Sequence, residues 1–196
     1  IDLSMSPAPA APAASAGFTH EGYLRAVARA IDYIAAGDIF QVNLSQRFTF
    51  PLVESPRTIY ERLRRRHPAW FGAYIECEDH AILSNSPELF LEVEPKGACR
   101  RVRTRPIKGT RPRARGLDLE LQRSEKDQAE LNMIVDLERN DLGRVCRIGT
   151  VRVTQPRSVE AHPTVFHGVA TVEGELREDV GLVDLLRATF PGGSIT

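Results

Sequence analysis

The chain has 196 residues, of which 42% are hydrophobic and 27% charged, and its formal net charge is zero. This is the composition of an ordinary globular protein. It contains no secretory signal pattern and no apolar run near the ~20 residues of a membrane-spanning helix. Cys77, Cys99 and Cys146 are too widely spaced for a metal motif or an evident disulfide framework, so we expect a cytoplasmic protein.

Both ends of the chain predict a fragment. Residues 1–17 begin with Ile1 and contain SPAPAAPAASAG, a Pro/Ala/Ser stretch that cannot build a core and predicts a disordered linker. The other end, FPGGSIT, stops in a glycine loop directly after a helical pattern. We therefore expect a linker over 1–17 and a partial domain over 18–196, truncated at its C-terminus.

The first predicted element is a helix that Thr19 caps and Gly37 ends, because apolar residues recur between them at spacings of three and four. Residues 38–50, DIFQVNLSQRFTF, then alternate and predict a strand. Its polar face carries Gln41, Asn43, Ser45 and Arg47. That face has two interpretations, the solvent side of a half-buried sheet or a polar floor for a small ligand with several oxygens.

The remaining elements alternate irregularly. A short basic helix is predicted from Pro56 to about His67, and the runs WFGAYIE, HAILSN and ELFLEVE predict an antiparallel meander, followed by a strand over 100–108. A long helix capped by Ser124 ends near Gly143. Two strands, GTVRVT and TVFHGVATVEGEL, and the helix VGLVDLLRATF complete the chain. The order predicts an α+β fold with a large antiparallel sheet and helices packed outside.

Lys108, in PIKGTRPR, is one of only three lysines beside 23 arginines. A lysine can lose its proton and become a nucleophilic amine, whereas an arginine cannot. Seven arginines share residues 100–115 with it, and three interpretations remain open: a nucleic-acid patch, an anion pocket whose positive charge lowers the pKa of Lys108, or a solvated basic strand and loop.

Acidic residues and one histidine supply further candidates. Asp127 and Glu130 share one helix face and suit Mg²⁺, although exposed acids in a first helical turn are the commoner explanation. Glu88, at a turn entering a strand, could have a raised pKa and act as a general acid, or be a surface glutamate. His167, within an apolar strand, is more often a hydrogen-bonded core histidine than a functional one.

Six stretches, in this order, resemble the chorismate-utilising enzymes: AGDIFQVNLSQRF, SNSPELFL, RPIKGTRPR, SEKDQAELNMIVDLERNDLGRV, VFHGVATVEG and FPGGSIT. The resemblance covers roughly residues 18–196, and it is stronger to aminodeoxychorismate synthase component I than to anthranilate synthase component I. It implies the anthranilate synthase-like fold, a large sheet sandwich with outer helices, and chorismate as the substrate.

The resemblance also implies roles for particular residues. Glu130 matches a Mg²⁺ ligand, Asp127 fills a neighbouring acidic position, and Glu88 matches the general acid/base that helps to expel the ring hydroxyl. Positions that line the substrate are matched by Gln41, Asn43, Thr110, His167, Gly192, Gly193 and Ser194. The family's further metal carboxylates lie beyond Thr196, so we expect this chain alone to be inactive.

Two positions indicate which reaction the family resemblance implies. Anthranilate synthases resemble PIAGTRPR, with alanine where this chain has Lys108, whereas in aminodeoxychorismate synthase a lysine at this place attacks the ring and forms a covalent intermediate. Relatives that add water carry a lysine base at the position of Gln41. The resemblance therefore implies ammonia as the nucleophile, delivered by a glutamine amidotransferase subunit or fused domain.

The expected function is amination of chorismate to 4-amino-4-deoxychorismate, on the route to 4-aminobenzoate and folate. Anthranilate synthase component I of tryptophan biosynthesis is the alternative within the family. We expect neither a membrane nor nucleic acid as a partner, and the alternative of another class is a nucleic-acid-binding module that uses residues 100–115.

Overall fold

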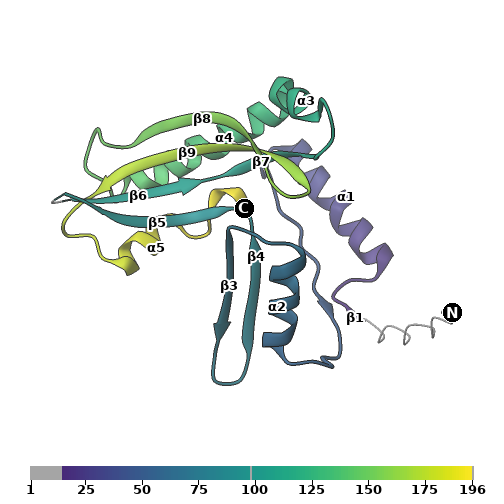
Figure 1. The fold of residues 1–196 in the computed structure, drawn as a ribbon. Coiled ribbons are helices and arrows are strands. Elements are labelled where there is room, and N and C mark those ends of the chain that lie inside the picture. The colour runs from purple at the N-terminus through teal and green to yellow at the C-terminus, as the bar shows by residue number, and fades with distance from the viewer. Residues whose placement is uncertain (1–14, 98, 196) are drawn as a thin grey trace, which may run out of the picture. The chain divides into compact units, whose positions relative to one another are not determined.

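The computed structural model describes residues 15–97 and 99–195, and these divide into two compact units between Ser55 and Pro56 (Figure 1). The predicted linker lies outside the described residues up to position 14. No helix in the described part of the chain combines the length and apolar character needed to cross a membrane.

The first unit contains one long helix and a two-stranded ladder. Helix α1 (His20–Ala36) begins where the Thr19 hydroxyl accepts a hydrogen bond from the Gly22 N–H at 3.0 Å, and it ends at Gly37, whose φ of 80° is left-handed. Strand β1 (Ser15–Ala16) pairs antiparallel with β2 (Phe48–Thr49). The predicted helix and both of its capping residues are confirmed.

The strand predicted over residues 38–50 is wrong for most of its length, because only Phe48 and Thr49 form a strand. An alternating segment forms a strand only where a neighbouring strand pairs with its backbone N–H and C=O groups. Strand β1 offers just two paired positions. Two apolar side chains of this segment are exposed to solvent, Phe40 by 81% and Val42 by 45%.

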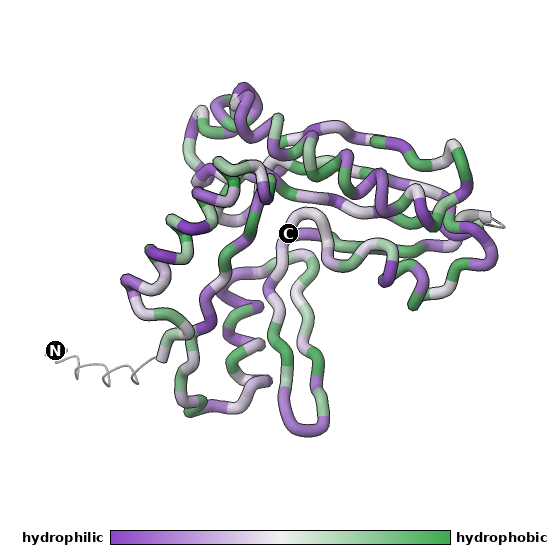
Figure 2. The backbone as a smooth tube through the Cα atoms, turned by 180° about the vertical axis from the view of Figure 1, so that it is seen from behind, coloured by the Kyte–Doolittle hydropathy of each residue, from purple (hydrophilic) through white to green (hydrophobic). Residues whose placement is uncertain are grey.

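The second unit opens with α2 (Pro56–Arg66) and a hairpin of β3 (Phe71–Glu76) and β4 (Ala81–Ser86). Figure 2 shows the hydrophilic tip of this hairpin, where the Cys77 N–H donates to the His80 carbonyl at 2.8 Å. The predicted meander stops here: β5 (Leu89–Lys96) belongs to a different sheet from β4. The SNSP sequence is therefore a corner between two sheets.

The larger sheet is antiparallel and has five strands: β5, β6 (Cys99–Arg105), β7 (Ile107–Pro112), β8 (Arg152–Ala161) and β9 (Val165–Leu176). Strand β9 pairs with β6, β7 and β8. Pro106 separates β6 from β7, so the single strand predicted over 100–108 is two. Alternation along β6 buries Val102 and Thr104 and leaves Arg101, Arg103 and Arg105 on the other face.

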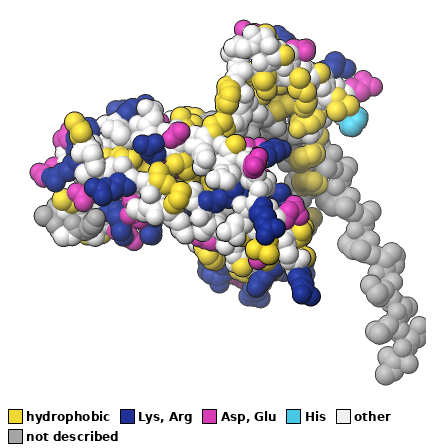
Figure 3. All heavy atoms as spheres, turned by 90° about the horizontal axis from the view of Figure 1, so that it is seen from above, with side chains coloured by type: hydrophobic (Ala, Val, Ile, Leu, Met, Phe, Trp, Pro, Cys, Tyr) yellow, Lys and Arg dark blue, Asp and Glu magenta, His cyan; other side chains and the backbone are white. Residues whose placement is uncertain are grey.

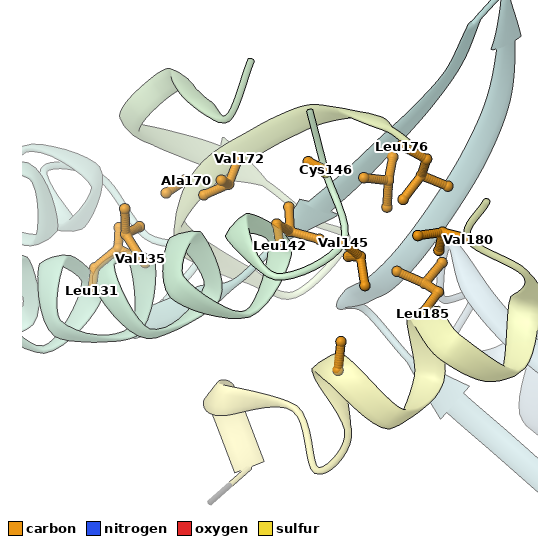
Figure 4. Packing of buried hydrophobic residues seen from close by; sticks show 12 residues of the cluster. Leu131, Val135, Leu142, Val145, Cys146, Ala170, Val172, Leu176, Val180 and Leu185 are labelled. Atoms are coloured by element: carbon orange, nitrogen blue, oxygen red, sulfur yellow. The ribbon is translucent and has the colours of Figure 1, made fainter. Parts of the chain in front are cut away.

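Helices pack against this sheet and enclose the core. They are α3 (Leu117–Arg123), α4 (Glu125–Gly143) and α5 (Leu182–Thr189), followed by the 3₁₀ turn η1 (Gly193–Ile195). Figure 4 shows Leu131, Val135 and Leu142 of α4 beside Ala170 and Val172 of β9. The hairpins, antiparallel sheet and packed helices confirm the predicted α+β class.

Candidate functional site

A pocket of about 220 Å³ in the second unit brings together several residues that the sequence singled out. Its walls come from the β4–β5 corner, from α4 and from the chain after α5. They comprise Ser86, Glu88, Leu89, Phe90, Glu138, Phe190, Gly192, Ser194 and Ile195. Two carboxyl groups thus share a pocket whose other walls include leucine, isoleucine and two phenylalanines.

Glu88 is fixed at the corner between β4 and β5. Its backbone N–H donates to the Ser86 hydroxyl at 3.1 Å, which holds the turn in place. Its Oε1 accepts a hydrogen bond from the Ile107 N–H at 2.6 Å, at the start of β7. The Glu88 carboxyl is therefore half-buried beside the residue that precedes Lys108.

Lys108 reaches the glycine loop at the end of the chain. Its Nζ donates a hydrogen bond to the Ser194 carbonyl oxygen at 2.8 Å. Ser194 lines the pocket, as does Glu88. Lys108, Glu88 and Ser194 come from three separate motifs of the sequence, and the structure brings all three together.

The glycines of the loop allow its close approach. A Cβ on Gly192 would lie 2.9 Å from the Phe90 ring, and one on Gly193 would lie 2.8 Å from the Leu137 side chain of α4. Larger residues at either position would push the loop away from β5 or α4, and with it the Ser194 carbonyl that holds Lys108.

Gly109 plays a comparable role on β7. Its φ is +83°, and an added Cβ would lie 2.7 Å from a Leu121 methyl carbon and 2.9 Å from the Asp127 side chain. The glycine that follows Lys108 is therefore required both by backbone conformation and by the close approach of α3 and α4.

Thr110 and His167 form a cross-strand pair between β7 and β9, with 2.9 Å between the threonine Oγ1 and the histidine Nδ1. Burial lowers the pKa of His167 below its ordinary value, and neighbouring His162 lowers it further. His167 is thus favoured as a neutral hydrogen-bonding ring. The structure brings these two predicted residues together.

Asp127 and Glu130 lie one turn apart on α4 but differ in surroundings. Asp127 is buried, and its Oδ2 lies 3.0 Å from the Arg111 guanidinium. Glu130 is half-buried, and its Oε1 lies 3.8 Å from the exposed Lys126 ammonium. A pair this long and exposed is weak. These two carboxylates fit a divalent cation in part. Glu130 is the more available oxygen ligand of the two, because Asp127 is already paired with Arg111.

The described residues contain no group of three or more His, Cys, Asp or Glu side chains arranged to hold a metal. Mg²⁺ commonly takes only one or two protein carboxylates and fills its other positions with water and substrate oxygens. The α4 carboxylates are therefore compatible with Mg²⁺ as a partial ligand set.

Glu138 is the pocket residue that sequence reasoning missed. It is only 8% exposed, and its Oε2 accepts a hydrogen bond from the Thr104 hydroxyl at 3.2 Å. Burial raises the pKa of Glu138 to about 8, and Glu88 and Asp141 add to the rise. The Thr104 hydrogen bond and the Lys108 cation oppose it.

A signal for Glu138 was present in the sequence. It follows Leu131 and Ile134 at helical spacings of seven and four, which places it on the apolar face of α4. A carboxyl on such a face must either be paired or have a shifted pKa.

Gln41 and Asn43 lie in the first unit, outside its helix and strands. Both residues are exposed, and the polar strand face to which they were assigned does not form. Their predicted contact with a ligand stays a prediction.

Several arginines of residues 100–115 have acidic partners. Arg101 lies 2.6 Å from Glu94, and Arg103 and Arg105 form ion pairs with Glu92 and Glu160. Figure 3 shows basic and acidic side chains intermingled over much of the face in view. This pairing neutralises charge that a nucleic-acid patch would need, and it argues against that interpretation.

Comparison with known proteins places these residues in context. Residues 4–196 match the family described as chorismate binding enzyme. The chain is 46% identical over 188 residues to aminodeoxychorismate synthase component 1 of Bacillus subtilis, covering 93% of this chain and 39% of that protein. It is also 46% identical over 187 residues to anthranilate synthase component 1 of Thermus thermophilus, covering 92% and 40% respectively.

Among solved structures, the chain resembles anthranilate synthase component I of Streptococcus pneumoniae with a TM-score of 0.84 and 32% identity, covering 95% of this chain and 41% of that one. The family resemblance and the anthranilate synthase-like fold predicted from the sequence are confirmed. The chain spans about two fifths of the length of these relatives.

Replacing Glu138 tests the effect of its burial on stability. An acid whose folded pKa is raised keeps its proton in the native state between about pH 4.3 and 8, where the unfolded chain has lost it. The free energy of unfolding of the wild type therefore falls across this window. Glu138→Gln has no such loss, so its advantage over the wild type should grow with pH by up to about 1.4 kcal/mol per unit.

Denaturant unfolding at pH 5, 6, 7 and 8 measures this difference. Asp136→Asn is the matched control, since Asp136 is an exposed acid on the same helix. If the free energies of unfolding of Glu138→Gln and the wild type change with pH in parallel, the raised pKa of Glu138 is contradicted.

Proposed function

Because the chain belongs to the chorismate-binding enzyme family, we propose that the protein carrying it is component I of aminodeoxychorismate synthase. It converts chorismate and ammonia to 4-amino-4-deoxychorismate, for 4-aminobenzoate and folate. Identity does not select this branch, because an aminodeoxychorismate synthase and an anthranilate synthase are each 46% identical to the chain.

The observation that carries the proposal is the position of Lys108. Its amine is hydrogen-bonded to the Ser194 carbonyl, in the wall of the pocket that contains Glu88. A lysine in this place is suited to nucleophilic catalysis, which divides one difficult substitution into two easier ones. The rival, anthranilate synthase component I, has no use for a nucleophile here.

The proposed reaction begins when the neutral Lys108 amine adds to C2 of the chorismate ring. The two conjugated double bonds of the ring shift, the bond from C4 to its hydroxyl breaks, and Glu88 donates a proton so that water leaves. Ammonia then adds at C4, the two double bonds shift back, and the Lys108 nitrogen leaves C2. The enolpyruvyl ether is retained, and a proton is released from the new amine.

Other predicted site residues have supporting roles in this proposal. The loop of Gly192, Gly193 and Ser194 lines the substrate and holds Lys108, and the Thr110–His167 pair offers hydrogen bonds to the substrate. Gln41 and Asn43 contribute polar contacts. Relatives of the chain are called component 1, a name that implies a second component. We therefore assign the supply of ammonia to a glutamine amidotransferase. We also propose that the protein acts in the cytoplasm.

Mg²⁺ is the proposed cofactor, and Glu130, with Asp127 beside it, would hold the ion. A bound Mg²⁺ would neutralise substrate carboxylate charge. The role of the chain is to present the Glu130 carboxylate on the rigid helix α4, and the Arg111 ion pair fixes Asp127 next to it.

The product identifies the branch. We expect the full-length protein, given chorismate, Mg²⁺ and ammonium, to form a product whose mass shows that the enolpyruvyl group is retained.

Glu88→Gln should lower the rate of amination by about 10²–10⁴-fold, as expected for loss of a general acid.

Lys108→Ala and Lys108→Arg should both abolish amination. The arginine variant is the sharper control, because it keeps a cation that can donate to Ser194 but cannot supply a neutral amine. Anthranilate with free pyruvate as the product, or full activity of Lys108→Arg, would rule out the proposal.

The metal assignment has a separate test. Glu130→Gln should raise the Mg²⁺ concentration that gives half-maximal activity, because one oxygen ligand loses its charge. Glu125→Gln removes another acid from α4 and should leave that concentration unchanged. Equal Mg²⁺ dependence for Glu130→Gln and the wild type would exclude Glu130 as a ligand.

A further inference from the structure

The hydrogen bond between Thr110 and His167 does not by itself fix the orientation of the histidine ring. Oγ1 of Thr110 lies 2.9 Å from Nδ1 of His167, but a hydroxyl group rotates freely and the outer torsion of a histidine side chain has broad preferences. A cavity of about 160 Å³, lined by His167 together with Asn85 and Pro87, leaves space beside the ring. A ring in this position is held in one plane only where a neighbouring side chain packs against it.

The ring of His162 makes such a contact. Its centroid lies 4.7 Å from the centroid of the His167 ring, and the two planes meet at 73°, so that one ring presents its edge to the face of the other. His162 is only 6% exposed, which places this ring in the protein interior. An edge-to-face contact between two rings restricts the angle between them, and this is the torsion of His167 that the Thr110 hydroxyl leaves open.

His162 is itself held on two sides. The Trp70 ring, from the segment directly before β3, lies 4.7 Å from the His162 ring with 33° between their planes. In the turn between β8 and β9, the His162 N–H donates to the Val165 carbonyl at 2.8 Å. The His162 carbonyl accepts a hydrogen bond from Nη1 of Arg113 at 3.3 Å. These contacts give His162 a fixed position against which His167 packs.

The contribution of His162 comes from its flat ring and not from a hydrogen bond of its Nε2 atom. This atom is buried and has no hydrogen-bond partner among the residues that the structure describes. A buried polar atom without a partner lowers stability, so polar pairing of Nε2 does not explain a histidine here. The neighbours Trp70 and His167 contact the ring itself.

We propose that His162 is a positioning residue for His167. Enclosed between Trp70 and His167, the His162 ring holds the His167 ring in the plane where Nδ1 meets Thr110. The Thr110–His167 pair is then presented to substrate in one arrangement, which matters because a small misplacement of a substrate-binding group lowers the rate. This inference rests on the proposed function for the contact between His167 and substrate.

Crystal structures of full-length variants, without substrate, test the positioning directly. In His162→Ala we expect the His167 ring to occupy more than one orientation or to leave Thr110, because the cavity beside it lets the ring turn. His162→Phe restores a flat ring and should keep the single orientation. A His167 ring that keeps one orientation and its contact with Thr110 in His162→Ala, held there by β7 alone, would overturn the proposal.

The kinetics of amination measure whether this orientation is used. His162→Ala should lower kcat/KM by roughly 10-fold to 10²-fold, the loss expected for a displaced binding group, and His162→Phe should recover most of it. Phenylalanine cannot carry the charge of an imidazole, so a folded but inactive His162→Phe would show that charge and not packing is needed. The matched control is His80→Ala, which removes an exposed histidine at the tip of the β3–β4 hairpin and should follow the wild type.

A double-mutant cycle separates positioning from a general loss of stability. If His162 acts through His167, then His162→Ala should have almost no further effect on kcat/KM in a protein that already carries His167→Gln. A merely structural role would lower kcat/KM by the same factor in both backgrounds, and that result would overturn the proposal.

Trp70→Ala keeps the proposal testable if His162→Ala does not fold, because Trp70 is 57% exposed. It removes the ring that supports His162 and should lower kcat/KM by a smaller factor, again only where His167 is present. Wild-type kcat/KM for Trp70→Ala would count against the proposed stack. If the wild type makes no aminated product, the proposed function fails, and the crystal structures still show whether His162 orients His167.

Discussion

The site depends on the packing of α4 against the sheet. Leu131 and Leu142 of this helix are almost completely buried, as is Val172 of β9. Each such side chain contributes roughly 1.5–3 kcal/mol through removal from water. Strands β7 and β9 and the turn η1, which carry Lys108, His167 and Ser194, pack against this helix. Gly109 allows β7 to pass its first turn, and Gly193 allows the terminal loop to contact Leu137.

The same burial creates the chemistry of the pocket. The face of α4 that packs on the sheet also carries Glu138, and the scarcity of water there raises its pKa. Lys108 is kept near by a hydrogen bond to a carbonyl, which fixes its Nζ without neutralising its charge. A buried acid, the proposed proton donor Glu88 and the proposed nucleophile Lys108 thus come from one packing arrangement.

Much of the fold could be predicted because its signals are local. Thr19 and Ser124 cap their helices through hydrogen bonds to N–H groups three residues on, and such bonds depend on a few neighbouring residues. The strand over 38–50 failed because pairing depends on distant segments, which alternation does not reveal. Helix α3 was missed because it has only seven residues, and its Gly116 cap offers no side-chain oxygen.

The site was predictable where a motif marks it and not where packing makes it. Motifs predicted Lys108, Glu88 and Ser194 as site residues. The structure places Glu88 and Ser194 in one pocket and joins Lys108 to Ser194 by a hydrogen bond. Glu138 lies within the motif stretch VDLERNDLG, where neighbouring charges favour reading it as a solvated acid. Its burial follows from which face of α4 packs against the sheet, and the sequence of the helix alone does not show where the sheet lies.

The most direct test of the account is whether Lys108 becomes covalently bound to substrate. The full-length protein would be mixed with chorismate and Mg²⁺ without ammonia, quenched in acid, digested and examined by mass spectrometry. The account predicts that the peptide containing Lys108 gains the mass of chorismate less one water. An unmodified peptide, from a preparation that forms 4-amino-4-deoxychorismate as soon as ammonium is added, would contradict it.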